Sequence, residues 1–148
     1  QDAARQAAIE ATKDPEPNDN DPQNTNVYET DESLNMYLGL HYPSSGAIEG
    51  VDPVLHHQNA PVHGIRFPQR IAQLLTSLGP ERNHRALDMG CAVGGASFEL
   101  AKHFDHVDAF DFSENFVAAA KRMQAQEDVR FRIPIEAELF HEVRATHE

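Results

Sequence analysis

Residues 85–98 constrain the fold of this chain more than any other stretch. A short apolar run ends in Asp88, a glycine-rich turn follows from Gly90 to Gly94, and an apolar segment continues to Phe98. This order predicts a strand, a tight turn and a helix, the unit that opens a nucleotide-type site in a doubly wound α/β sheet. Glycine at positions 90 and 94 allows the backbone to turn sharply and to approach a ligand closely.

Asp88 distinguishes between two kinds of ligand. A carboxylate two residues before the first glycine repels a pyrophosphate, whereas it can accept a hydrogen bond from the ammonium group of S-adenosyl-L-methionine. Unpaired N–H groups near Gly94–Ala96 would receive the carboxylate of the same ligand. The pattern therefore predicts an S-adenosylmethionine site whose methionine portion is lined by Gly90, Cys91, Ala92 and Gly94. The alternative is an ordinary strand-to-helix turn.

A second acidic residue supports this interpretation. Residues 107–111 alternate like a strand and end in Asp111, close to the roughly 20-residue spacing at which dinucleotide sites place an acid on the ribose. Because both cofactors contain that ribose, Asp111 suits either, and its alternative role is to cap the next helix. Phe112 is a candidate for contact with adenine or for the core. Ser113 is a cofactor-site candidate and the expected N-cap of the helix.

Composition limits the partners and the compartment. The chain has 148 residues and a formal net charge of −12, which argues against nucleic acid or an anionic membrane as its main partner. No apolar stretch approaches the roughly 20 residues that span a bilayer. The single cysteine excludes an internal disulfide and fits a reducing compartment, so a cytoplasmic location is expected.

Two regions precede the expected sheet. Residues 1–26 are predicted to be flexible, since Lys13–Asn26 contain no apolar residue other than proline, although the alanine-rich Gln1–Thr12 could form a short helix. Residues 27–80 are predicted to form a helical region that packs on the sheet or covers the ligand. Its first helix begins at Thr30 or Asp31 and ends before Pro43, and residues 44–63 form a loop. The second helix begins near Pro68, ends at Gly79, and carries an apolar stripe of Ile71, Leu74, Leu75 and Leu78.

Residues 81–148 are predicted to form half of a cofactor-binding domain. Strands are expected at 85–89, 106–111 and 129–133, with helices at 95–103 and from Ser113 onward. The buried stripe of the second helix is Phe116, Val117, Ala120 and Met123. Because Ile135, Leu139, Phe140 and Val143 fall at helical spacing, Glu136–Thr146 is also predicted to be a helix.

These motifs resemble class I S-adenosylmethionine-dependent methyltransferases. More narrowly, Asn26–Asp31, His41-Tyr42, Phe67–Arg70 and Ala86–Leu100 resemble the methyltransferase domain of ovothiol-biosynthesis enzymes. That resemblance implies methylation of an imidazole nitrogen of a mercaptohistidine, a small-molecule acceptor. Gly95 departs from the family pattern, which commonly has arginine there, and this weakens the assignment to that substrate.

The resemblance also implies an incomplete domain. The family has a seven-stranded Rossmann-like sheet, of which this chain supplies the first three strands, so residues 85–89 should form an open edge. The chain alone is then expected to bind cofactor weakly and to turn over little, with the missing half of the domain as a partner. Because the sulfonium methyl is already activated, catalysis is mainly placement of the nucleophile, and no catalytic residue is predicted.

Several weaker candidates remain. Tyr28 and Arg70 are candidates for contact with the substrate or with the cofactor carboxylate, the alternatives being packing and a solvated helix face. Glu136 follows the third strand, where the family often contacts adenine, and is otherwise a surface acid. The histidines at positions 56, 57 and 63 lack metal-site spacing, so no metal is predicted. Two other functions stay open: a Rossmann-type nucleotide-cofactor module, and a non-catalytic remnant that serves as an interaction surface.

Overall fold

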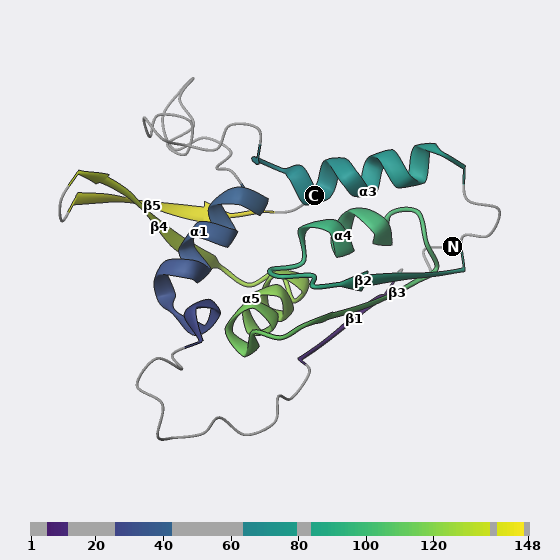
Figure 1. Ribbon diagram of the computed structural model, residues 1–148, viewed down its shortest axis with the longest axis horizontal. Helices are drawn as coiled ribbons and strands as arrows, with labels where there is room; N and C mark the ends of the chain where they lie inside the picture. The colour runs from purple at the N-terminus through teal and green to yellow at the C-terminus, as the bar shows by residue number, and fades with distance from the viewer. Residues whose placement is uncertain (1–5, 12–25, 43–63, 80–83, 137–138, 147–148) are drawn as a thin grey trace.

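The computed structural model describes residues 6–11, 26–42, 64–79, 84–136 and 139–146 (Figure 1). Three parallel strands form one sheet in the order β1-β3-β2, and two more form a separate antiparallel hairpin, β4-β5. This mixed architecture confirms the predicted α/β class and is consistent with part of a Rossmann-like fold. The elements are β1 (Gln6–Ala11), η1 (Val27–Glu29), α1 (Asp31–His41), α3 (Phe67–Ser77), β2 (Arg85–Met89), α4 (Gly95–Ala101), β3 (His106–Asp111), α5 (Glu114–Gln124), β4 (Val129–Glu136) and β5 (Leu139–Ala145).

The unit from β2 to α5 agrees with the sequence prediction. β2 runs parallel to β3, with Arg85 opposite His106 and Met89 opposite Phe110. Ser113 caps α5, because its hydroxyl oxygen accepts a hydrogen bond from the Phe116 N–H at 3.1 Å. The expected stripe of α5 is buried: Phe116, Val117, Ala120 and Met123 are each at most 2% exposed.

The two helices before the sheet also form where the sequence predicts them. Thr30 caps α1 by accepting the Ser33 N–H at 3.2 Å, and α1 buries Leu38 and His41. α3 lies against α4, with the sheet beyond (Figure 1), and Ala72 of α3 packs with Leu100 and Val107. The larger apolar side chains of α3 lie outside this contact; Ile71, Leu74, Leu75 and Leu78 are 39–74% exposed. The loop predicted at 44–63 lies outside the described residues.

The prediction of a helix within Gln1–Thr12 is wrong for the part of this segment that the structure describes. Gln6–Ala11 is strand β1, inside the segment expected to be flexible, and it pairs in parallel with the whole of β3. The resemblance to the methyltransferase family implies that residues 129–133, the third strand of that domain, take this position beside β3. The alanine content favours a helix only weakly, and pairing with a free strand edge overrides such a preference.

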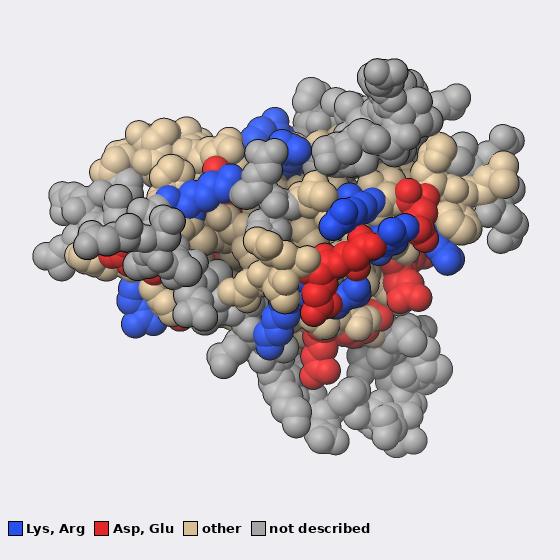
Figure 2. All heavy atoms as spheres, turned by 180° about the vertical axis from the view of Figure 1, so that it is seen from behind, with Lys and Arg blue, Asp and Glu red and all other residues tan. Residues whose placement is uncertain are grey.

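The helix expected at Glu136–Thr146 is also wrong. Leu139–Ala145 forms β5, which pairs antiparallel with β4, so the strand at 129–133 belongs to a hairpin instead of the parallel sheet. Burial has a period of two here, since Val143 and Ala145 are buried while Phe140 is 46% exposed. Arg130 forms ion pairs of 2.9 Å with both Asp128 and Glu142. Figure 2 shows acidic and basic side chains side by side on the face that includes this hairpin.

β2 is an edge strand, as the sequence predicts. Among the described residues it pairs with β3 alone, and its side chains Leu87 and Met89 are 59% and 69% exposed. Within the same ranges, no helix has both the length and the apolar content needed to cross a membrane.

Candidate functional site

Two carboxylates lie at the carboxyl ends of neighbouring parallel strands. Asp88 is near the end of β2, and Asp111 is the last residue of β3. The two are close enough for the charge of Asp111 to raise the pKa of Asp88. This end of the sheet therefore has a negative potential, which favours a positively charged ligand.

Asp88 is also tied to the first turn of α4. Its Oδ2 accepts a hydrogen bond from the Ser97 hydroxyl at 2.6 Å, and Ser97 is fully buried. Burial raises the pKa of Asp88 most, the hydrogen bonds from Ser97 lower it, and the charge of Asp111 raises it; the net shift is upward. The carboxylate thus holds strand and helix together and is partly withdrawn from solvent.

The turn after β2 requires unusual backbone angles. Gly90, Ala92 and Gly94 have φ values of 77°, 46° and 87°, all in the left-handed region. A Cβ at Gly90 would meet nothing within 4 Å, so open space remains beside the turn for a ligand. A Cβ at Gly94 would come 2.9 Å from the Phe98 ring, so only glycine fits there. Cys91 and Ala92 are buried, and burial raises the pKa of the Cys91 thiol to about 12.

Asp111 organises the loops at this end of the sheet. One of its oxygens accepts the Ala92 N–H at 2.8 Å, and the other accepts the Ser113 N–H at 2.9 Å. These two bonds hold the carboxylate between the glycine turn and the start of α5. Ser113 itself is fully buried, and its hydroxyl donates to the Tyr28 carbonyl at 3.0 Å. Its described role is structural, because no surface of this residue is open to a cofactor.

The N–H groups that the sequence assigns to a ligand carboxylate are already used. The Gly94 N–H donates to the Cys91 carbonyl at 2.8 Å, and the Gly95 N–H donates to Nδ1 of His41 at 3.1 Å. The expectation of free donors at these two positions is therefore wrong. The reason is tertiary: the end of α1 inserts a buried imidazole at the point where α4 begins.

His41 is a site residue that sequence reasoning missed. Burial lowers its pKa to about 4, so the ring is neutral near pH 7 and Nδ1 can accept the Gly95 N–H. A Cβ at Gly95 would lie 2.5 Å from Nδ1 of His41, which explains why this chain has glycine where arginine is common in the resembling family. The signal available in the sequence was the adjacent pair His41-Tyr42. Tyr42 is buried too and donates from its hydroxyl to the Val93 carbonyl at 2.7 Å.

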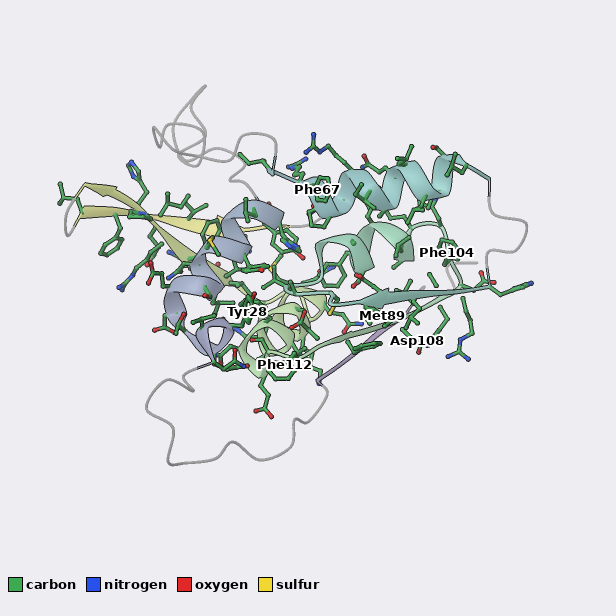
Figure 3. All side chains as sticks on the ribbon, viewed as in Figure 1. Tyr28, Phe67, Met89, Phe104, Asp108 and Phe112 are labelled. Atoms are coloured by element: carbon green, nitrogen blue, oxygen red, sulfur yellow. The ribbon has the colours of Figure 1, made fainter. Side chains whose placement is uncertain are left out.

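Two aromatic candidates lie at the same end of the sheet as Asp111. Figure 3 labels both side chains, and Phe112 is 44% and Tyr28 47% exposed to solvent. The Tyr28 ring contacts Phe116 edge-on, with centroids 6.2 Å apart. Both rings therefore combine a packed part with a surface that a planar ligand can reach.

The remaining candidates are not brought to this site. Arg70 lies on α3 and lines a separate cavity with His41 and Gly95. The side chain of Glu136 lies outside the described part of the chain, as do the histidines at 56, 57 and 63. Among the described residues, no group of three or more His, Cys, Asp or Glu side chains is arranged to hold a metal ion.

Comparison with known proteins adds one finding. Residues 86–144 match the model of a family described as a methyltransferase domain. The match supports a methyltransferase. It begins in β2 and ends in β5, so it contains both carboxylates and the glycine turn. No curated protein matches the chain.

Proposed function

We propose that this chain is part of an S-adenosylmethionine-dependent methyltransferase. The observation that carries the proposal is the pair Asp88 and Asp111 at adjoining strand ends, beside the open space at Gly90. A cationic sulfonium ligand fits this negative edge better than a pyrophosphate does. The methyltransferase-domain match over residues 86–144 supports the same class of reaction.

The chain's own residues would then divide the work of binding. When bound, S-adenosylmethionine supplies an already activated methyl group. Asp111 would accept from the ribose hydroxyls, and Phe112 would lie against the adenine. Gly90 would admit the ligand because its α-carbon carries no side chain. Oδ1 of Asp88 would face the ammonium group, while the hydrogen bond from Ser97 to Oδ2 fixes the direction of the carboxylate.

The acceptor that we propose is an imidazole nitrogen of a mercaptohistidine, as in ovothiol biosynthesis. Support comes from the way the resembling motifs converge. Glu29 accepts the N–H groups of Glu114 and Asn115 at 2.8 and 3.1 Å, which joins the motif at 26–31 to the start of α5. The Gln69 side chain donates to the His41 carbonyl, which joins the motif at 67–70 to the one at 41–42.

We further propose that this chain alone has little activity. β2 is an edge strand among the described residues, and the cofactor crevice of such sheets lies beside the first strand of the motif. Within the described part of the chain, one wall of the site is therefore open. A ligand held from one side loses less water-exposed surface, and its affinity falls accordingly.

Ligand binding tests the cofactor assignment. The chain is titrated with S-adenosylhomocysteine and with NADH, and ¹⁵N NMR follows the amides of Gly90, Ala92 and Phe112. We expect these signals to move with the first ligand and not with the second. Asp111→Asn should weaken the effect about tenfold, whereas Asp105→Asn, a surface variant before β3, should not. Shifts with NADH alone would refute the proposal.

A second experiment tests the acceptor. The chain is incubated with S-adenosylmethionine and either a mercaptohistidine or plain histidine, and methylated products are measured by mass spectrometry. Slow transfer to the mercaptohistidine ring alone supports the narrower assignment. Equal transfer to both compounds, or transfer at the rate of a complete enzyme, would overturn the acceptor or the low-activity proposal respectively.

A further inference from the structure

A cavity lies between the end of α1, the start of α3 and α4. Its volume is about 280 Å³, and its lining includes His41, Arg66, Gln69, Arg70, Glu99 and Lys102. Pockets for drug-sized ligands span about 300–1,000 Å³, so this one suits a small molecule or one end of a larger one. It is separate from Asp88 and Asp111, neither of which lines it.

The lining is positively charged although the chain is strongly acidic. Arg66, Arg70 and Lys102 are cationic, and Glu99 is the one carboxylate in the described lining. Glu99 is already engaged, because it pairs with Lys102 at 3.1 Å and accepts from the Gln73 side chain at 3.1 Å. His41 is neutral near pH 7. A net positive lining in a chain of net charge −12 marks this cavity as a place for an anion.

Arg66 is the arginine best placed for a ligand. Its guanidinium has no ion pair or hydrogen bond among the described residues, while its backbone N–H is fixed to the Leu40 carbonyl at 2.7 Å. Its φ of 54° is left-handed, a conformation that costs a residue with a side chain more than it costs glycine. The fold therefore anchors the Arg66 backbone, and no described residue neutralises its guanidinium. Guanidinium groups bind carboxylates through two parallel hydrogen bonds.

Gln69 supplies an acceptor in the same lining. Its Nε2 donates to the His41 carbonyl, which fixes the orientation of the amide. Its Oε1 is buried and has no hydrogen-bond partner within the described ranges. Buried polar atoms are almost always paired, so an unpaired acceptor beside a cavity indicates a missing donor.

We propose that this cavity binds an α-amino-carboxylate group, with the carboxylate at Arg66 and Arg70 and the ammonium at the Gln69 carbonyl oxygen. The inference deepens the proposed function and rests on it. The histidine-type acceptor of that reaction carries such a group at its amino-acid end, whereas the ammonium of the methyl donor is assigned to Asp88. His41 and Gly95 join the cavity to the glycine turn, since they line it and are hydrogen-bonded to each other at 3.1 Å.

Three ligands test the inference. S-adenosylhomocysteine has the nucleoside and the amino-carboxylate, 5′-methylthioadenosine has the nucleoside alone, and L-histidine has the amino-carboxylate alone. Each is titrated into the full chain, and ¹⁵N NMR follows the Gln69 side-chain amide and the Gly95 backbone amide. We expect the Gln69 signals to move with L-histidine, and not with S-adenosylhomocysteine or 5′-methylthioadenosine. A response of the Gln69 signals to S-adenosylhomocysteine without a response to L-histidine would assign the cavity to the methyl donor and overturn the inference.

Variants complete the experiment. Arg66→Gln should weaken the binding of L-histidine about tenfold, whereas the matched surface variant Arg122→Gln on α5 should not. If L-histidine does not move the Gln69 signals, or if Arg66→Gln leaves its affinity unchanged, the inference is wrong. Failure of the proposed function is distinguishable, because it would appear as unmoved signals at Gly90 and Phe112 with both nucleosides.

Discussion

The contact between His41 and Gly95 makes a quantitative prediction about substitution at position 95. In Gly95→Ala the new methyl carbon would lie 2.5 Å from Nδ1 of His41 and 2.7 Å from the Gln69 amide nitrogen. The amide end can rotate away, but the buried imidazole cannot without breaking its hydrogen bond to the Gly95 N–H. Overpacking costs about 1–3 kcal/mol, and the lost hydrogen bond about 1 kcal/mol more. Alanine recovers at most about 1 kcal/mol of helix propensity.

The net expectation for Gly95→Ala is a loss of about 1–3 kcal/mol in the free energy of unfolding. Urea unfolding measures this, since at a slope of about 1–3 kcal/mol/M the midpoint should fall by about 1 M. The decisive control is the same substitution in a His41→Ala background, where the imidazole is gone. There the cost should fall to about zero, which gives a coupling energy of about 2 kcal/mol. An equal cost in both backgrounds would refute the idea that His41 excludes a side chain at position 95.

Three further predictions concern titration, reactivity and capping. Burial lowers the pKa of His41 to about 4, so as the pH falls the imidazole is protonated in the unfolded chain before it is protonated in the folded chain. The free energy of unfolding should therefore decline between about pH 6.5 and pH 4. Urea unfolding at a series of pH values measures this decline, and the His41→Asn variant should lack it. The Cys91 thiol is buried and its pKa is raised to about 12, so at pH 8 it should resist iodoacetamide in the folded chain and react with it in urea. Equal rates of alkylation in the folded and unfolded chain would contradict this prediction. Ser113→Ala should cost about 1–2 kcal/mol in thermal or urea unfolding because α5 loses its cap, while Ser77→Ala at the exposed end of α3 should cost much less.

The sequence predicted well those elements whose signals are local. The strand, turn and helix from Arg85 to Ala101 follow from a short apolar run, glycines at left-handed positions and an apolar helix face. The caps Thr30 and Ser113 are likewise single residues that bond three positions ahead. Asp88 and Asp111 could be placed together because parallel strands end at the same edge of a sheet.

The sequence failed where distant pairing decides the structure. Nothing within Gln6–Ala11 indicates that this segment will run beside β3, since that choice depends on an edge far along the chain. The apolar residues of Leu139–Ala145 fit a helix and a strand almost equally, and the cross-strand contacts of β4 select the strand. His41 could not be identified as the partner of Gly95 because 54 positions separate them.

The outer edge of β2 should make the oligomeric state of the chain depend on its concentration. Within the described ranges no strand pairs with the outer side of β2, so its peptide groups there, flanked by Leu87 and Met89, form a template for another extended segment. Two molecules can pair through their β2 edges and form one continuous sheet. Dilute samples should therefore remain monomeric, while concentrated samples self-associate. A chain that supplied its own strand at this margin would remove the template and close the crevice in one step.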